Sequence, residues 1–237
     1  MSLLHVDSVS KRFGGLTANE DVSFDVQAGQ IVGLIGPNGA GKTTLFNCVA
    51  GFFAPSAGNI ILDGVPIGGR PPEACARAGV GRTFQIARTF TSMTACENVM
   101  TAAMLHWPRP ARAREAAMNW LKFVNLDRFA DKPAGSMTVS EQRRLAVARA
   151  LAIAPRILLM DEVMAGLNPS EVKEAVDVVL KIRESGVACL IVEHVLEGIM
   201  PIADKIVVLD RGRKIAEGTP RDVSRNPQVI SAYLGDA

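Results

Sequence analysis

The hydrophobic pattern at the start of the chain predicts short strands. Residues 4–7 and 22–26 alternate apolar with polar side chains, and residues 9–13 do so more loosely. A period of two is typical of strands that bury one face. Gly14-Gly15 and Ala28-Gly29 separate these runs. The pattern therefore indicates an antiparallel region with one face against the core.

The later strands are apolar on both faces. Residues 30–35, 157–161 and 188–192 are nearly continuous apolar runs, as expected for buried parallel strands. Shorter strands are predicted at 60–62, 80–84, 205–209 and 214–217. Helices are predicted at 43–49, 71–79, 169–186 and 196–202, with a terminal helix from residue 226. This alternation predicts an α/β fold with a mostly parallel core and an antiparallel edge region.

Residues 86–153 have a helical pattern instead. Thr94 and Glu97 form a capping box that opens a helix running towards Leu105. A second helix is predicted at 112–124, and a third begins near Ser140 and reaches Ala152. We therefore expect one domain, with an α/β core made of residues 1–85 and 154–237 and a helical subdomain inserted at residues 86–153.

Composition narrows the class of protein. The 237 residues include 26 Lys and Arg and 24 Asp and Glu. The net charge is therefore too small to attract nucleic acid or anionic lipid by a strong electrostatic field. The hydrophobic fraction is 48%, yet no apolar run approaches the ~20 residues of a membrane-spanning helix. No secretory signal is visible at the start. The four cysteines lack metal-ligand spacing, and we expect them to be buried thiols in a reducing cytosol.

The run at residues 36–44 matches the phosphate-binding loop Gly-x-x-x-x-Gly-Lys-[Ser/Thr]. It follows a predicted strand and opens a predicted helix, so backbone N–H groups and the helix N-terminus can surround phosphate oxygens. Lys42 can reach the β- and γ-phosphates, and Thr43 offers a hydroxyl to Mg²⁺. The expected nucleotide contacts are Gly36, Pro37, Asn38, Gly39, Ala40, Gly41, Lys42, Thr43 and Thr44.

Acidic and polar residues follow other predicted strands. Asp161 can hold Mg²⁺, and Glu162 beside it can polarise the water that attacks the γ-phosphate. An acidic pair alone would equally suit an exposed turn, but the phosphate loop upstream favours the catalytic interpretation. Gln85 and His194 also follow strands, where ligands bind in open α/β sheets. A lone Gln or His at such a place is more often an ordinary loop residue.

The order of these features resembles that of an ATP-binding-cassette (ABC) ATPase along nearly the whole chain. Five runs are similar, more narrowly, to the ATPase subunits of branched-chain (hydrophobic) amino-acid importers: residues 11–16, 81–85, 93–99, 165–169 and 209–220. The resemblance implies a P-loop NTPase (RecA-like) core that binds ATP and Mg²⁺. It implies that Phe13 stacks on adenine, although an ordinary core position is the alternative. It also implies catalytic roles for Glu162, His194, Lys42 and Gln85, and metal contacts from Thr43, Gln85 and Asp161.

The resemblance also implies partners. The helical subdomain would dock on a transmembrane permease at the cytoplasmic face of the membrane, and a periplasmic or extracellular solute-binding protein would act indirectly. A second ABC ATPase would complete a head-to-tail dimer, which residues 165–168 would cross. In such dimers each ATP also meets the partner's signature, usually Leu-Ser-Gly-Gly-Gln. Here Thr138 and Ser140 are the residues expected to contact the partner's nucleotide.

The signature of this chain departs from the family pattern. Residues 137–141 read Met-Thr-Val-Ser-Glu, and β-branched Val139 resists unusual φ angles. Glu141 is expected to add negative charge near phosphate, and the penalty would vanish if its side chain pointed away. The damage falls on the partner's nucleotide, so an asymmetric heterodimer is favoured over a homodimer. Val163 and Val195 also replace the usual Pro and Asp after the acidic pair and the histidine.

Alternative functions stay open. The chain could be a regulatory clamp that dimerises on ATP with little hydrolysis, or an ABC ATPase for another cargo such as urea, amides or lipopolysaccharide. A cassette acting on DNA or ribosomes is disfavoured, because the sequence has no basic, aromatic-interleaved patch. Glu162 favours an enzyme over a clamp.

Overall fold

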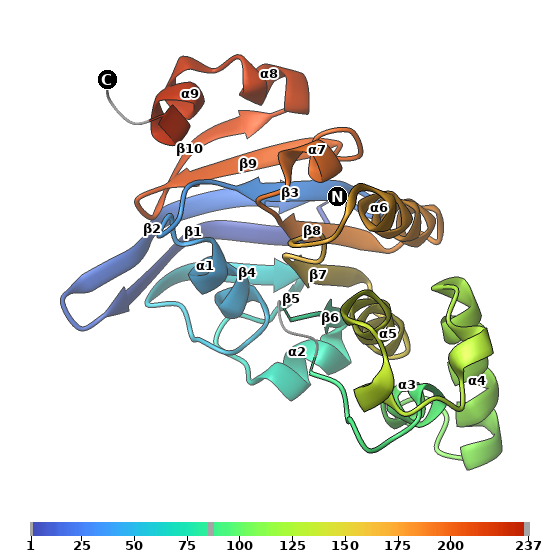
Figure 1. Ribbon diagram of the computed structural model, residues 1–237. Coiled ribbons are helices and arrows are strands. Elements are labelled where there is room, and N and C mark those ends of the chain that lie inside the picture. Colours follow the sequence, from blue (N-terminus) through green and yellow to red (C-terminus); the bar gives the residue numbers. More distant parts are fainter. Residues whose placement is uncertain (1, 85–87, 235–237) are drawn as a thin grey trace.

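The computed structural model describes residues 2–84 and 88–234. Their strands form two sheets, and a group of helices lies to one side of these sheets (Figure 1). The α/β class expected from the hydrophobic pattern is confirmed.

The first sheet contains antiparallel strands in the order β2-β1-β4-β5. Their bounds are β1 Leu4–Phe13, β2 Leu16–Val26, β4 Ala57–Leu62 and β5 Val65–Pro66. The antiparallel region predicted from the alternation is confirmed, but the two strands expected at 4–7 and 9–13 form one. Ser8 has a φ of 50°, and the register with β2 shifts between Val6 and Val9. This irregularity interrupts the alternation without ending the strand.

The second sheet has the order β10-β9-β3-β8-β7-β6. Its strands are β3 Ile31–Ile35, β6 Val80–Arg82, β7 Ile157–Asp161, β8 Ala188–Val192, β9 Lys205–Asp210 and β10 Arg213–Gly218. β9, β3, β8, β7 and β6 are parallel, and β10 pairs antiparallel with β9. The strand predicted at 80–84 ends two residues early, although the Thr83 N–H still donates to the Leu159 carbonyl at 2.9 Å. Parallel register brings the carboxyl ends of four adjacent strands, β9, β3, β8 and β7, to one edge.

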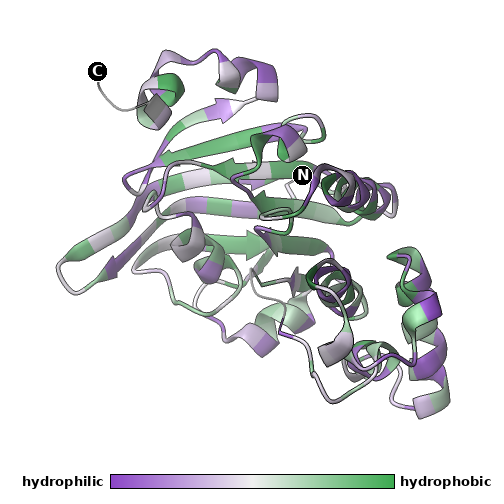
Figure 2. Ribbon diagram, viewed as in Figure 1, coloured by the Kyte–Doolittle hydropathy of each residue, from purple (hydrophilic) through white to green (hydrophobic). Residues whose placement is uncertain are grey.

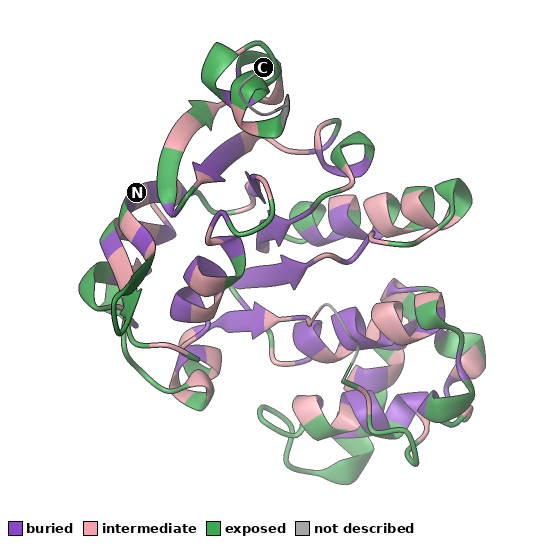
Figure 3. Cartoon of the chain, turned by 60° about the vertical axis from the view of Figure 1, so that its left-hand side comes forward, coloured by how far each residue is buried: buried purple, intermediate pink, exposed green. Residues whose placement is uncertain are grey.

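The strands at the centre of this sheet carry the core. Every residue of β3, β7 and β8 is buried, and these strands are hydrophobic in Figure 2 and buried in Figure 3. The four cysteines, Cys48, Cys75, Cys96 and Cys189, are free and buried, as predicted. None of the helices in the described part of the chain has the length and apolar character to cross a bilayer.

Helices α1 Lys42–Val49, α2 Pro72–Ala78, α6 Pro169–Glu184 and α7 Leu196–Ile199 connect strands. Helices α8 Pro220–Ser224 and α9 Pro227–Leu234 follow β10. The helix predicted at 196–202 is shorter than expected. Pro201 has no N–H to continue the helix, and the N–H groups of Ile202 and Ala203 both donate to the carbonyl of Ile199, the last residue of α7.

Three further helices lie together beside the sheet edge at β6 (Figure 1). They are α3 Ala95–Ala103, α4 Pro110–Phe123 and α5 Val139–Leu151. The capping box predicted at Thr94 is present, with both reciprocal hydrogen bonds to Glu97. α4 begins two residues before the predicted start, because Pro110 occupies the first turn, where its missing N–H costs nothing. The limits of the helical subdomain, 86 and 153, stay a prediction.

Asn98 fixes the loop that leads into α3. Its side chain is fully buried. Its Oδ1 accepts from the Phe90 N–H at 2.8 Å, and its Nδ2 donates to the carbonyls of Phe90, Met93 and Thr94 at 3.0, 3.3 and 2.9 Å. Each of these three carbonyls also accepts a backbone N–H, so Asn98 adds a second donor to them and ties the loop at residues 90–94 to α3.

We expect Asn98→Ala to lower the free energy of unfolding by about 3 kcal/mol, because it removes a fully buried side chain together with its four hydrogen bonds to the loop. Urea unfolding followed by circular dichroism measures this loss. Asn119→Ala is the matched control, since Asn119 is exposed on α4 and its truncation should change stability by less than about 0.5 kcal/mol. Equal stability of the two variants would contradict the assigned role of Asn98.

Candidate functional site

A cleft of about 550 Å³ opens at the edge where the parallel strands end. The residues that line it are Leu16, Thr17, Ala18, Asn38, Gly39, Ala40, Gly41, Lys42, Thr43, Thr44, Glu162, His194, Arg211 and Gly212. The structure thus brings most of the predicted phosphate loop together with Glu162 and His194, which lie more than 100 residues away in sequence. The strand order explains this meeting, because β3 lies beside β8 and β8 lies beside β7.

The loop at 36–44 folds tightly because two glycines allow close backbone contact. Gly36 has a φ of 150°, and a Cβ there would collide with the carbonyl oxygen of Leu209 at the end of β9. Gly41 has a φ of 93°, and a Cβ would collide with the carbonyl oxygen of Ala18 and with the Asn19 amide. Asn19 is buried and donates from Nδ2 to the Gly41 carbonyl at 3.2 Å. The loop is therefore held against β2 and β9 by contacts that only glycine permits.

The loop ends in a helix N-terminus that faces the cleft. Gly41 is the N-cap of α1, and no side chain caps the first turn. The first N–H groups of a helix lack intrahelical partners and carry the positive end of its dipole. An anion such as phosphate satisfies both needs.

Lys42 is held at the wall of this cleft. Its ammonium is largely buried and donates to the carbonyls of Gly36 and Pro37 at 2.7 and 2.9 Å. Burial lowers the pKa of Lys42, while the nearby charges of Glu162 and Asp161 oppose that shift. The lysine thus sits within reach of two carboxylates and beside the loop that would cradle phosphates.

Glu162 and His194 form a pair across the cleft. His194 Nε2 lies 2.8 Å from Glu162 Oε1. Glu162 has a φ of 49°, in the left-handed region, and its N–H donates to the Val192 carbonyl of β8 at 2.9 Å. Backbone strain of this kind is found where a fixed side-chain direction matters. Val163 follows Glu162 and Val195 follows His194, and both depart from the family pattern. The contact between Glu162 and His194 forms with these two residues in place.

Asp161 ends β7 as a buried carboxylate. Burial raises its pKa, and the Arg82 guanidinium, 3.7 Å away, opposes that shift. Arg82 also donates to Asn47 Oδ1 at 2.6 Å, so it connects β6, the helix after the phosphate loop, and Asp161. Nothing in the sequence pattern assigned a role to Arg82, although it falls in a run that resembles the importer ATPases.

The donor set suits Mg²⁺ better than a transition metal. Thr43 supplies a hydroxyl in the cleft, and Asp161 supplies a carboxylate at the end of β7, one residue before Glu162 of the cleft lining. Mg²⁺ prefers such oxygen donors, with phosphate oxygens completing its shell. Within residues 2–84 and 88–234, no cluster of three or more His, Cys, Asp or Glu could hold a metal. A metal that arrives with a nucleotide fits these residues, and a protein-only cage does not.

Several predicted site residues lie outside the cleft lining. Phe13 is 42% exposed and packs edge-on against Phe53, with ring centroids 5.2 Å apart. Thr138 and Ser140 lie at the start of α5, a different element from those that form the cleft. Gln85 falls outside the residues that the structure describes. The roles predicted for these residues stay predictions.

The Glu141 side chain is held within the start of α5, and its effect on a partner's nucleotide stays a prediction. The Glu141 carboxylate is largely buried, lies 2.9 Å from Lys132 Nζ, and accepts from the Thr138 N–H at 2.9 Å. Burial alone would raise the pKa of Glu141, but the Lys132 ammonium and the Thr138 N–H lower it on balance. Thr138 accepts in return from the Glu141 N–H, which completes a capping box. The charge is thus neutralised within the helix start, and Val139, 66% exposed, is the departure that faces outward.

The sequence analysis missed part of the cleft wall. Leu16, Thr17 and Ala18 come from the start of β2, and Arg211 and Gly212 from the turn after β9. The Gly212 N–H donates to the Ala40 carbonyl at 3.1 Å, which joins this turn to the phosphate loop. The rule that ligands bind at the carboxyl ends of parallel strands, applied to the predicted strand 205–209, would have indicated the turn.

Comparisons with known proteins agree with this geometry. The family model described as "ABC transporter" matches residues 19–165, and the model described as "Branched-chain amino acid ATP-binding cassette transporter" matches residues 213–237. The high-affinity branched-chain amino acid transport ATP-binding protein BraF of Pseudomonas aeruginosa is 45% identical, covering 99% of this chain and 98% of BraF. The corresponding protein LivG of Escherichia coli K12 is 40% identical over the same shares.

A solved structure shares the whole fold. The ATP-binding cassette MJ1267 of an ABC transporter, in its ADP conformation, superposes with a TM-score of 0.90 at 29% identity, covering 100% of both chains. The resemblance inferred from the motifs is therefore confirmed over nearly the full length. With its phosphate loop, its carboxylate–histidine pair and these relatives, the chain belongs to the ABC transporter family, as one of its ATP-binding subunits.

Proposed function

We propose that the chain hydrolyses ATP to drive a membrane importer for branched-chain or other hydrophobic amino acids. The observation that carries the enzymatic part is the contact of 2.8 Å between Glu162 and His194 at the rim of the phosphate cleft. The cargo is supported by the printed names of BraF and LivG and by the family model at residues 213–237. ATP is the substrate that the cleft suits.

The phosphate loop and its lysine would hold the triphosphate. Backbone N–H groups of residues 38–44 and the start of α1 suit the phosphate oxygens. Lys42, already partly desolvated, would exchange its loop carbonyls for the β- and γ-phosphates. Mg²⁺ would be held by Thr43 and Asp161 and, when bound, neutralises phosphate charge.

Glu162 would prepare the attacking water. A carboxylate beside the γ-phosphate position can accept the water proton as the bond to phosphorus forms. His194 Nε2 donates to this carboxylate when the proton is on that nitrogen, so the imidazole fixes the direction of Glu162. The same contact keeps the acceptor from swinging into solvent, where it would be useless for catalysis.

A second surface suits the membrane partner. A groove of about 680 Å³ lies between the parallel sheet and the helices α3 and α5. Its walls include the rings of Phe52, Phe84 and Phe90 and the guanidinium groups of Arg88 and Arg149. We propose that a cytoplasmic helix of a transmembrane permease, apolar on one side and carrying a carboxylate, docks here. This contact would hold the chain at the cytoplasmic face of the membrane, and a solute-binding protein outside would act through the permease.

A second ATPase would complete the site. The start of α5 would meet the nucleotide held by that partner, and here Val139 and Ser140 replace the usual glycines. Glu141 does not add to this defect, because Lys132 neutralises it. We therefore propose a heterodimer in which a partner with an intact signature supports hydrolysis in the cleft of this chain.

The substitution Glu162→Gln distinguishes an ATP-hydrolysing enzyme from a regulatory clamp with little hydrolysis. We expect kcat to fall by about 10²–10⁴-fold, because an amide cannot accept the water proton. ATP affinity should persist, since Lys42 and the loop are untouched. The measurements are steady-state phosphate release and the binding of a fluorescent ATP analogue. Glu184→Gln, at the exposed end of α6, is the control. Turnover as low in this control as in Glu162→Gln would favour the clamp, and equally brisk turnover would contradict the role of Glu162.

The heterodimer predicts slow, non-cooperative turnover by the purified chain alone. Adding a second ATPase with an intact Leu-Ser-Gly-Gly-Gln signature should raise turnover about tenfold or more, which corresponds to 1.36 kcal/mol or more of the barrier. Restoring both glycines, with Val139→Gly and Ser140→Gly together, should raise the turnover of the chain alone in the same direction. Brisk, cooperative turnover of the unmodified chain would contradict the asymmetric arrangement.

Phe90→Ala tests the docking groove. Phe90 is 49% exposed beside Arg149, and truncating an aromatic anchor at an interface costs about 2 kcal/mol or more. We expect at least about tenfold weaker association with the permease, measured by co-purification from detergent. Ile230→Ala, which removes a similarly exposed apolar side chain on α9, should leave association intact. If the two variants lost the same affinity for the permease, the permease would bind at another surface of the chain.

A further inference from the structure

Glu193 is a buried carboxylate that the proposed mechanism does not use. It follows β8 and directly precedes His194. Only 1% of it is exposed, whereas carboxylates are almost never fully buried unless they have partners. The free energy of burying this group must therefore be recovered through specific contacts.

Those contacts are backbone N–H groups from two separate loops. Glu193 Oε1 accepts from the Met164 N–H at 2.7 Å, in the loop after β7. Oε2 accepts from the His194 N–H at 3.3 Å, and the Val195 N–H also donates to the carboxylate. Burial raises the pKa of Glu193, while these three N–H groups oppose that shift and the charge of Glu162 reinforces it.

The contacts close a ring around the catalytic pair. Glu162 reaches His194 through its side chain. His194 follows Glu193 in the chain, and Glu193 reaches Met164, which lies two residues after Glu162. The Ala165 N–H returns to the Glu162 carbonyl at 3.4 Å. A shift of the loop at 163–168 would therefore change the position of both members of the pair.

The same loop is held on its other side by α5. Arg143 Nη1 donates to the Ala165 carbonyl at 2.5 Å. Met164 packs against α7 so closely that a Cβ on Gly198 would collide with its sulfur. The loop thus lies between the helix that begins with Thr138 and the carboxylate of Glu193.

We propose that Glu193 is a positioning residue, which transmits the position of the loop at 163–168 to Glu162 and His194. The inference rests on the proposed ATP hydrolysis, and it deepens it. A second ATPase that contacts residues 165–168 would move the Met164 N–H, and the carboxylate would pass that movement to the backbone of His194. Turnover in this cleft would then depend on the fit of the partner at the loop.

A carboxylate suits this task because it accepts hydrogen bonds at both oxygens. Gln at position 193 has nearly the same shape, but its NH₂ group would face a backbone N–H, so one loop would lose its acceptor. Asp keeps both acceptors on a side chain one methylene shorter. The series Glu193→Gln and Glu193→Asp therefore separates hydrogen-bonding capacity from shape.

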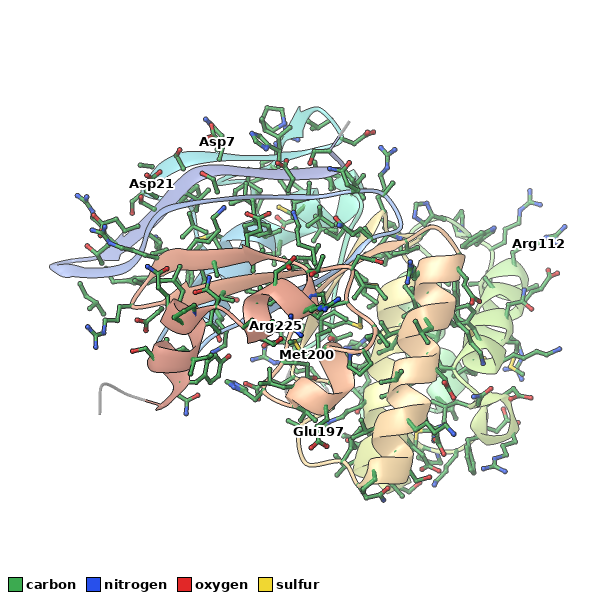
Figure 4. The ribbon with its side chains drawn as sticks, turned by 90° about the horizontal axis from the view of Figure 1, so that it is seen from above. Asp7, Asp21, Arg112, Glu197, Met200 and Arg225 are labelled. Carbon is green, nitrogen blue, oxygen red and sulfur yellow. The ribbon has the colours of Figure 1, made fainter. Side chains whose placement is uncertain are left out.

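The test uses the full chain with its second ATPase. We expect Glu193→Gln to lower kcat about tenfold, with ATP affinity and the midpoint of thermal unfolding close to those of the unmodified protein. Glu193→Asp should recover part of the rate, and it replaces the Gln variant if that protein does not fold. Glu197→Gln is the matched control, because Glu197 is an exposed carboxylate on α7, four residues further along (Figure 4).

A double-mutant cycle distinguishes positioning from general stabilisation. If Glu193 acts through His194, the variant that combines Glu193→Gln with His194→Ala should turn over no more slowly than His194→Ala alone. Two results would overturn the proposal. One is a double variant whose loss of kcat is the product of the losses of the two single variants, and the other is a Glu193→Gln variant as fast as the Glu197→Gln control. Absence of turnover in the unmodified complex would instead overturn the proposed function, on which this inference rests.

Discussion

Close backbone contact at two glycines determines the geometry of the cleft. Gly36 lies against the Leu209 carbonyl at the end of β9, and Gly41 lies against the Ala18 carbonyl of β2. These contacts fix both ends of the loop at 36–44 against different sheets, so the N-terminus of α1 and Lys42 can point in only one direction. The rest of the site depends on this constraint, since a displaced loop would no longer line the same cleft as Glu162 and His194. The loop is preorganised by packing rather than by ligand contacts.

Charge balance is the second requirement of the site. Glu162 and Asp161 lie close enough to Lys42 to affect its pKa, Arg82 lies close enough to affect the pKa of Asp161, and Lys42, Asp161 and Arg82 are largely buried. Each carboxylate raises the pKa of Lys42 against the effect of burial, and Arg82 lowers the pKa of Asp161 in the same way. An added anion and its metal would enter a site where neither sign of charge is in large excess. Both can then be bound without leaving a protein charge unpaired.

The sequence could predict the elements better than the contacts between them. Apolar runs located β7 and β8 to the residue, because strands buried on both faces have no competing interpretation. It could also place Glu162 and His194 at one edge, since the carboxyl ends of parallel strands meet there. It could not predict the Glu141–Lys132 ion pair, because that pair joins the first turn of α5 to a loop whose position depends on the packing of α3, α4 and α5. The turn that contains Arg211 could have been found from the strand before it, but its hydrogen bond to the Ala40 carbonyl is a tertiary contact that the sequence does not specify.

The case of Glu141 shows why a motif must be interpreted through hydrogen bonds. The sequence of the signature alone predicts that Glu141 places a negative charge against phosphate. In the structure, the Thr138 N–H and the Lys132 ammonium account for that charge, and the carboxylate stabilises the start of α5. The helix start that would meet the partner's nucleotide is therefore well formed, and its dipole still favours an anion. What remains unusual is Val139, whose exposed β-branched side chain stands where a glycine would let backbone touch phosphate. The asymmetry of a dimer would thus come from the shape of this surface, and not from its charge.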